Sequence, residues 1–311
     1  MITPLQVVLV TGVGGFIGRY VARYFMGKGW MVIGIDNSPP ENAPLNDLTV
    51  YHRLQLPHSD LISILQETPP QVVIHCAGRA SVGLSVKEPS ADFYGNTVLT
   101  FELLNALRLQ APQCRFILLS SAAVYGNPTS IPICESQMTV PLSPYGFHKL
   151  QCEQLCLEFT KLYSLPTACV RIFSAYGPGL RRQVLWDICQ KAILHDRVVL
   201  QGTGQESRDF IHAVDIAKAL FAIASTAVMQ GEAYNLAAGG EVTITELARL
   251  VLKALNYEGK LEFDNKVPTG NPLNWQADIS KLQTLGFTPT VALEQGVQTF
   301  ASWCRAELVG V

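Results

Sequence analysis

Short apolar runs alternate with longer amphipathic segments through the first half of the chain. Residues 7–11 and 31–35 form continuous, β-branched runs, which are typical of strands buried on both faces of a parallel sheet. The same pattern predicts further strands at 50–56, 72–76, 115–119 and 166–172. Between these runs apolar residues recur at helical spacing, which predicts helices at 20–25, 60–67, 92–109 and 145–163.

A glycine-rich turn joins the first predicted strand to the first helix, and the second predicted strand ends in Asp36. The glycines let the backbone approach a pyrophosphate, which binds the amides at the helix N-terminus. The carboxylate of Asp36 can accept hydrogen bonds from the adenosine ribose, and its charge would repel a 2′-phosphate. The segment therefore predicts a site for NAD in preference to NADP. Its turn residues are Gly12, Gly14, Gly15, Phe16, Ile17 and Gly18.

This alternation of strands and helices predicts an α/β protein with a Rossmann-type doubly wound parallel sheet. After residue 173 the alternation loosens. We therefore expect a dinucleotide-binding domain at 1–173 and a smaller mixed α/β C-terminal lobe at 174–311 that mainly binds substrate. A predicted helix at 214–224 and strand at 232–236 are expected to return to the first domain. Ligands of such sheets bind at the carboxyl ends of the strands.

Ser121, Tyr145 and Lys149 are the candidate catalytic residues. Tyr145 and Lys149 are four residues apart, so they share one face of the predicted helix at 145–163. A tyrosine hydroxyl is a poor base at neutral pH, but an ammonium group held nearby favours the phenolate. Ser121 ends the fifth predicted strand and offers a hydroxyl to a substrate oxygen. A Tyr-x-x-x-Lys spacing is common by itself, and it becomes informative because the chain builds a nicotinamide site around it.

Composition and charge narrow the possible partners and the compartment. The formal net charge is −2 and the chain has no basic run, which argues against a nucleic-acid or anionic-membrane partner. We see no signal peptide or membrane span. The eight cysteines are scattered without a Cys-x-x-Cys pair, so we expect a cytoplasmic protein with reduced thiols and no metal site. His75 falls inside a strand pattern and is interpreted as a partly buried structural histidine rather than a catalyst.

Together these motifs resemble the extended short-chain dehydrogenase/reductases, in the NAD-dependent group of nucleotide-sugar epimerases and dehydratases. The resemblance covers nearly the whole chain and is most specific at 75–86, which is similar to the corresponding segment of UDP-galactose (UDP-glucose) 4-epimerases. The other segments that carry it are 11–18, 93–97, 120–126, 143–149 and 208–212.

The resemblance implies a role for each matching residue. Tyr145 would exchange a proton with a sugar hydroxyl at C4, Ser121 would hydrogen-bond the same oxygen, and Lys149 would also contact the nicotinamide ribose. The residues implied to contact the cofactor, besides the glycine turn and Asp36, are Asn37, Leu56, Cys76, Ala77, Gly78, Asn96, Ser120, Tyr145, Lys149 and Ile172. The residues implied to contact a nucleotide-diphosphate sugar are Ser81, Val82, Ser121, Tyr145, Ser174, Arg181 and Arg208. A homodimer through the helices at 92–109 and 145–163 is also implied.

The departures from the family pattern narrow the activity. Ala122 and Ala123 stand where dehydratases and decarboxylases of the family carry acidic residues, which argues against both activities. The segment 268–272 lacks the arginine with which the family often contacts a phosphate, and Arg181 or Arg182 is expected to replace it.

We therefore predict a 4-epimerase that retains NAD through its cycle. Two alternatives stay open. One is a reductase of 4-keto-6-deoxy nucleotide sugars, favoured by Ser174, which stands where 4-epimerases commonly have an asparagine. The other is a non-catalytic NAD-binding protein, which would have no need of the Ser-Tyr-Lys set.

Overall fold

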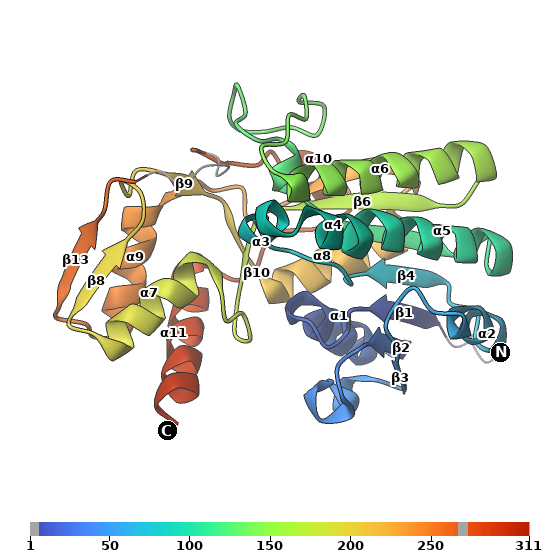
Figure 1. The fold of residues 1–311 in the computed structure, drawn as a ribbon, viewed down its shortest axis with the longest axis horizontal. Helices are drawn as coiled ribbons and strands as arrows, with labels where there is room; N and C mark the ends of the chain where they lie inside the picture. Colours follow the sequence, from blue (N-terminus) through green and yellow to red (C-terminus); the bar gives the residue numbers. More distant parts are fainter. Residues whose placement is uncertain (1–5, 267–272, 311) are drawn as a thin grey trace.

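The computed structural model describes residues 6–266 and 273–310 and is built around a parallel sheet of seven strands (Figure 1). The strand order is β3-β2-β1-β4-β5-β6-β11, and every neighbouring pair is parallel. The order runs outward in both directions from β1 and β4, so the predicted Rossmann-type doubly wound sheet is confirmed. The strands are β1 (Val7–Thr11), β2 (Met31–Asp36), β3 (Val50–Arg53), β4 (Val72–His75), β5 (Arg115–Ser121), β6 (Thr167–Ile172) and β11 (Gln230–Leu236).

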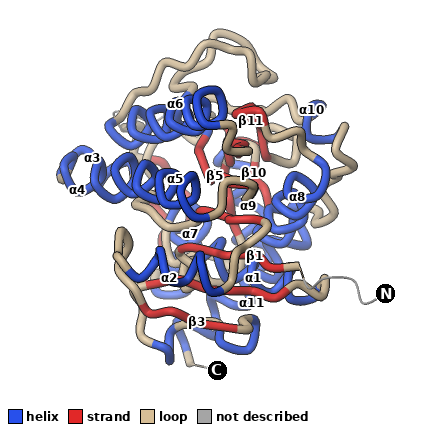
Figure 2. The backbone as a smooth tube through the Cα atoms, turned by 90° about the vertical axis from the view of Figure 1, so that its right-hand side faces the viewer, coloured by secondary structure: helices blue, strands red, loops and turns tan. Residues whose placement is uncertain are grey.

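Helices cover both faces of this sheet, as Figure 2 shows in a view turned to the side. Alternate residues of β1 point to opposite faces: Val8 and Val10 pack in the core beneath α1 and α8, whereas Val7 and Leu9 pack beneath α2, α5 and α6. Burial on both faces explains why the strands are continuously apolar in sequence. The helices are α1 (Phe16–Gly27) and α8 (Ala213–Thr226) on one face, and α2 (Asp60–Glu67), α5 (Leu99–Gln110) and α6 (Pro144–Tyr163) on the other.

A second lobe lies beside the carboxyl edge of the sheet, on the left of Figure 1. Its core is formed mainly by apolar residues of three helices and of the strands packed against them, among them Ile188, Val198, Leu247 and Phe300. Its main elements are α7 (Gln183–Leu194), β8 (Arg197–Leu200), α9 (Ile244–Ala254), β13 (Lys260–Phe263) and α11 (Leu293–Val309). Between the lobe and the sheet lie β7 (Ser174–Tyr176), β9 (Ser207–Arg208), β10 (Phe210–His212) and β12 (Val242–Thr243), whereas α10 (Ser280–Gln283) packs against β11 of the sheet.

Two predicted elements differ from the structure. The predicted helix at 92–109 consists of α4 (Pro89–Phe93), a π-helical turn (Tyr94–Val98) and α5. Asn96 lies in this π-helical turn, which is wider than a turn of α-helix. Its side-chain amide donates to the carbonyls of Asp92 and Arg79. The third strand ends at Arg53 rather than at residue 56. In the part of the chain that the structure describes, no helix has the length and apolar character needed to cross a membrane.

Candidate active site

The predicted cofactor and catalytic segments follow strands that end side by side. In the register of the sheet, Thr11 of β1 is opposite His75 of β4, and Ser121 of β5 is opposite Ile172 of β6. The glycine turn after β1, the loop at 76–78 after β4 and the end of β5 therefore share one edge of the sheet. This is the edge at which doubly wound sheets bind their ligands.

The glycine turn is closely packed against the loop after β4, and it leads into the N-terminus of α1. Gly12 has φ +67°, and a Cβ atom on it would lie 2.6 Å from the backbone nitrogen of Ala77. A Cβ atom on Gly18 would lie 2.2 Å from the carbonyl oxygen of Gly12. The N-cap of α1, Gly15, has no side chain that could accept a bond from the first amides of the helix. Such an N-terminus suits a phosphate group.

Asp36 lies over this turn and is held there by backbone donors. Its Oδ2 accepts from the amide of Gly14 at 2.9 Å, and its Oδ1 accepts from the amide of Ser38 at 2.8 Å. A Cβ atom on Gly14 would lie only 3.1 Å from the carboxyl carbon of Asp36. The neighbouring Asn37 donates to Gln55 at 2.7 Å. The negative charge is thus fixed at the end of β2, where the sequence predicts the adenosine ribose.

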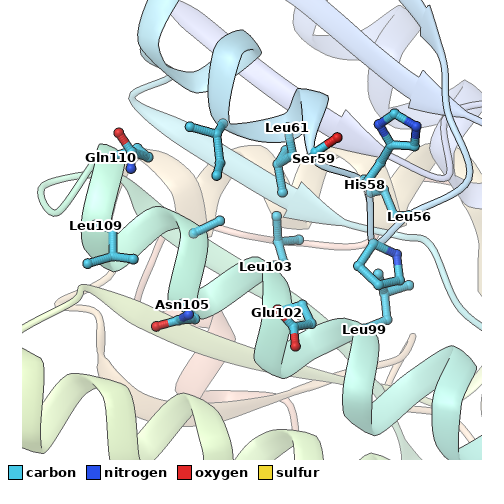
Figure 3. Close-up of a pocket in the computed structure, with 13 residues that line it drawn as sticks. Leu56, His58, Ser59, Leu61, Leu99, Glu102, Leu103, Asn105, Leu109 and Gln110 are labelled. Atoms are coloured by element: carbon cyan, nitrogen blue, oxygen red, sulfur yellow. The ribbon is translucent and has the colours of Figure 1, made fainter.

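Leu56 is buried and lines a cavity of about 340 Å³ between α2 and α5 (Figure 3). The lining is largely apolar, and Leu61 and Leu103 face each other across it. Of the residues that the sequence predicts for the cofactor, only Leu56 contributes to this cavity. The cavity is therefore separate from the edge that carries the catalytic candidates.

Asn96 supports the loop that follows β4. It is almost fully buried, and its Oδ1 lies 2.6 Å from the position that a Cβ atom on Gly78 would take. Its amide nitrogen donates to the carbonyl of Arg79 at 3.0 Å. These contacts fix the backbone of the loop that carries the predicted cofactor residues Cys76, Ala77 and Gly78.

The first turn of α6 brings Tyr145 to the end of β5. Ser143 caps the helix by accepting from the amide of Gly146 at 3.2 Å, and the hydroxyl of Ser85 accepts from the amide of Tyr145 at 3.1 Å. A Cβ atom on Gly146 would lie 2.7 Å from the carbonyl oxygen of Ala123, so the helix packs directly on the turn that follows Ser121. The hydroxyl of Ser121 accepts from the amide of Ala123 at 3.2 Å. Two segments far apart in sequence thereby place their hydroxyl groups in one region.

Lys149 is buried beneath Tyr145. Its Nζ donates to the carbonyl of Leu119 at 3.0 Å and lies 6.0 Å from the centre of the Tyr145 ring. Among the described residues, no carboxylate forms an ion pair with this ammonium group. Burial raises the pKa of Cys76 to about 12, although the charge of Lys149 opposes that shift. The positive charge of Lys149 therefore reaches the end of β4.

His75 is a structural residue, as the sequence predicts, although it is more fully buried than expected. It is 1% exposed, and its two ring nitrogens lie 2.7 Å from the hydroxyl of Thr11 and 3.4 Å from that of Thr100. Burial, and then the charge of Lys149, lower its pKa to about 3. His75 is therefore neutral near pH 7 and joins β1, β4 and α5 in the core.

The predicted substrate residues are spread over both lobes. Ser81 caps α3 (Val82–Lys87) by accepting from the amide of Leu84 at 3.3 Å. Arg208 lies over the ring of Trp275 at 5.4 Å, and burial lowers its pKa to about 10, so it stays charged. Ser174 begins β7 and donates its amide to the carbonyl of Asp209 at 3.0 Å.

The two neighbouring arginines take different directions. Arg181 forms an ion pair with Glu307 of α11, with Nε 2.8 Å from Oε1. Arg182 donates to the carbonyl of Ala80, beside Ser81. The segment 268–272, where the family arginine is missing, lies outside the described residues.

A buried ion pair between α6 and β6 was not predicted from the sequence. Glu153 of α6 pairs with Arg171 of β6 at 2.7 Å, and both side chains are less than a tenth exposed. Glu153 follows Lys149 by four residues, so it continues the stripe formed by Tyr145 and Lys149. This spacing was the available clue, but it does not indicate the partner on another strand.

Comparison with known proteins assigns this site to a family. The model of the NAD dependent epimerase/dehydratase family matches residues 8–237. The UDP-glucose 4-epimerase of Halalkalibacterium halodurans is 29% identical over 95% of this chain and 95% of its own length.

Two solved structures are similar over nearly the whole chain. The UDP-glucuronic acid 4-epimerase of Bacillus cereus, in complex with UDP-glucuronic acid and NAD, is 28% identical, with a TM-score of 0.88 over 97% of this chain and 100% of that one. The UDP-N-acetylglucosamine 4-epimerase of Methanobrevibacter ruminantium M1, in complex with UDP-N-acetylmuramic acid, is also 28% identical, with a TM-score of 0.88 over 98% and 100%. These proteins share a reaction type, while their names differ in the sugar.

The burial of neutral His75 has a consequence for stability. Its pKa is lower in the folded chain than the ordinary value of 6.5, so unfolding takes up a proton below that pH. The stability that it contributes is present above pH 6.5 and is lost as pH falls toward 3, by about 1.4 kcal/mol per pH unit. Denaturant titrations at several pH values are expected to show this slope in the wild type and in the exposed control His58→Asn, but not in His75→Asn. If the free energy of unfolding changes with pH at the same slope in all three proteins, that pH dependence cannot be assigned to His75.

Proposed function

This chain belongs to the NAD dependent epimerase/dehydratase family, and on that premise we propose that it is a nucleotide-diphosphate-sugar 4-epimerase. As a member of the family it is an NAD-dependent enzyme. The observation that carries the proposal is that the start of α6, with Tyr145 and buried Lys149, packs on the turn that follows Ser121, at the same sheet edge as the glycine turn. The names of the relatives support the same reaction, an inversion at C4 of a sugar linked to UDP.

The residues at the sheet edge fit NAD. The turn at Gly12 has no room for side chains where it contacts Ala77, and the N-terminus of α1 offers amides to the pyrophosphate. Asp36, fixed by the amides of Gly14 and Ser38, would hold the adenosine ribose. When bound, NAD supplies the acceptor and the donor of the hydride.

The protein's own residues would move the proton. The hydroxyl oxygen of Tyr145 would take the proton from the C4 hydroxyl of the sugar and return it after the sugar has turned over in the site. The ammonium group of Lys149 stabilises the negative charge that develops on the phenol oxygen, because no described carboxylate neutralises it. Ser121 would donate a hydrogen bond to the same sugar oxygen and keep it beside Tyr145.

The residues next to Ser121 favour epimerisation over elimination of water. Ala122 is fully buried and Ala123 presents only a methyl group, so this turn offers no second acid to a leaving hydroxyl. Reduction of a 4-keto-6-deoxy nucleotide sugar would use the same Ser-Tyr-Lys set. It remains the second candidate, because Ser174 replaces the asparagine expected near the substrate phosphates.

The first test is a panel of UDP-sugars with chromatographic detection of the 4-epimer. We expect the purified protein to carry NAD and to form an epimer without net consumption of added cofactor. Tyr145→Phe is expected to lower kcat by about 100-fold or more while NAD stays bound, because only the proton-transferring group is removed. If instead NADH or NADPH is oxidised in step with a 4-keto-sugar and no epimer forms, the protein is a reductase.

We also propose that Arg181 contacts a phosphate of the substrate. To do so it must leave Glu307, with which it is paired in the structure. Arg181→Ala is then expected to raise KM for the UDP-sugar about tenfold with little change in kcat, since one charge-assisted hydrogen bond is lost. Arg182→Ala is the matched control. A raised KM in the control alone would transfer the role to Arg182, and an unchanged KM in both variants would refute it.

Finally, we propose that two copies associate through α5 and α6. These helices lie side by side on one face of the sheet (Figure 2). They expose apolar side chains, among them Phe101, Phe147 and Leu162. Leu162 is 69% exposed, which is unfavourable for a side chain that faces only water. Leu162→Glu is expected to shift the protein from dimer to monomer in sedimentation velocity experiments. Leu194→Glu, at a 52% exposed leucine of the second lobe, serves as the control and should leave the dimer intact.

A further inference from the structure

We propose that the buried ion pair of Glu153 and Arg171 positions the catalytic helix and keeps the charge of Lys149 free to act on Tyr145. The inference rests on the proposed function, because it assigns the pair a role in proton transfer by Tyr145. Neither residue lines the site, so both act through their neighbours. The ion pair has a geometric role, which is to fix α6, and an electrostatic role, which is to leave the charge of Lys149 free to act on Tyr145.

The geometric role of the pair is to help fix α6 to β5. Tyr145, Lys149 and Glu153 are spaced four residues apart on one face of the helix, and all three are at most 9% exposed. Lys149 donates to the carbonyl of Leu119, and Glu153 accepts from the hydroxyl of the next residue, Ser120, at 2.5 Å. The catalytic face of the helix is thus bound to the two residues immediately before Ser121.

Arg171 extends these contacts to the neighbouring strand. It is opposite Ser120 in the sheet register, and its guanidinium contacts both oxygens of Glu153, at 2.7 to 3.2 Å. It also donates to the hydroxyl of Tyr125 at 2.8 Å, which in turn donates to Asn235 of β11 at 2.7 Å. The pair therefore joins α6 to three strands of the sheet.

A buried ion pair rarely stabilises a fold more than apolar residues of the same size would, because both charges lose their hydration. Stability alone is therefore a weak reason for placing Glu153 and Arg171 beneath the active site. Their position, one helical turn below Lys149, gives a more specific reason.

The electrostatic role of the pair depends on the carboxylate of Glu153. If it were unpaired, it would lie one turn from the ammonium of Lys149 and would reduce that group's effect on the phenol oxygen. Arg171 neutralises it instead. Burial alone would lower the pKa of Arg171, but the carboxylate of Glu153 and the hydroxyl of Tyr125 outweigh burial and raise it.

The groups around the pair do not change this balance near neutral pH. The pair faces Lys149 on its own helix, Tyr125 and Glu135 in the segment after β5, and Cys169 on β6. Burial raises the pKa of Tyr125 to about 12, and the pKa of Cys169 is raised by its bond to Cys156 and by burial, so both stay protonated.

Around Lys149 itself the situation is similar. Burial lowers the pKa of His75 to about 3 and raises that of Cys76 to about 12. Both groups are therefore neutral near pH 7. Besides Lys149, Glu153 and Arg171, α6 carries His148, which pairs with the buried Asp92 of α4 at 2.6 Å. The carboxylate of Glu135 accepts from the backbone amide of Asn235 at 2.8 Å.

The test uses charge changes of opposite effect in the holoenzyme. Glu153→Gln keeps the shape of the side chain but leaves the guanidinium of Arg171 unpaired, and arginine cannot lose its proton. We expect the ionisation midpoint of the Tyr145 hydroxyl to fall by about half a pH unit, because a positive charge is added about two helical turns away. In the double variant Glu153→Gln/Arg171→Met both charges are gone, and the midpoint is expected to return to the wild-type value.

The midpoint is measured without any sugar, by NMR titration of protein labelled with ¹³C in the tyrosine rings, with Tyr145→Phe to assign the signal. A purely structural role predicts that the double variant, which loses more hydrogen bonds, departs further from the wild type. Equal ionisation midpoints of Tyr145 in all three proteins, or a larger shift in the double variant, would overturn the electrostatic role of the pair.

Glu153→Asp tests the geometric role of the pair. It also keeps the proposal testable if Glu153→Gln does not fold. It keeps the charge but shortens the reach to Ser120. We expect an unchanged midpoint for Tyr145 and about a tenfold lower kcat with unchanged KM, because misplacement of α6 affects chemistry and not binding. An unchanged kcat would refute the positioning role. If the wild type turns over no UDP-sugar while the ionisation midpoint of Tyr145 shifts as expected in the variants, the epimerase proposal fails and the electrostatic role of the pair stands.

Discussion

The burial of charged side chains beneath α6 is the constraint on which the rest of the site depends. An ammonium group that is 6% exposed needs acceptors in place of water, and Lys149 finds one in the carbonyl of Leu119. Glu153, one turn further along, is engaged by Ser120 and Arg171. Since both contacts are made to the end of β5 and to its neighbour β6, they fix the position and rotation of the helix that carries Tyr145.

Close backbone contacts complete this arrangement. Gly12 approaches Ala77, and Gly146 approaches Ala123, at distances that leave no room for a Cβ atom. The first contact brings the glycine turn to the loop after β4, and the second brings the start of α6 to the turn after Ser121. The cofactor edge and the candidate catalytic residues are thereby parts of one surface. This would suit the proposed reaction, in which a hydride leaves and returns to C4 while a proton leaves and returns to the C4 oxygen.

The proposed catalytic residues and the proposed substrate residues are positioned in different ways. Ser121, Tyr145 and Lys149 lie at the end of β5 and at the start of α6, so the doubly wound sheet determines their positions. The sugar would be selected by side chains such as Arg181, which pairs with Glu307 of the second lobe, and Arg208, which lies over the ring of Trp275. Accordingly, the similar proteins have the fold in common with this chain but are named for different sugars.

The sequence by itself determined the sheet, the glycine turn with Asp36, and the Tyr145–Lys149 spacing, because each depends on residues that are close along the chain. It also indicated that His75 is structural, since a histidine inside a buried strand has little access to substrate. Only the tertiary structure decided the π-helical turn at Asn96, the ion pair between Arg181 and Glu307, and the partner of Glu153. These features join residues on separate elements, and their distances depend on the register of strands and the packing of helices. Local periodicity carries no information about either.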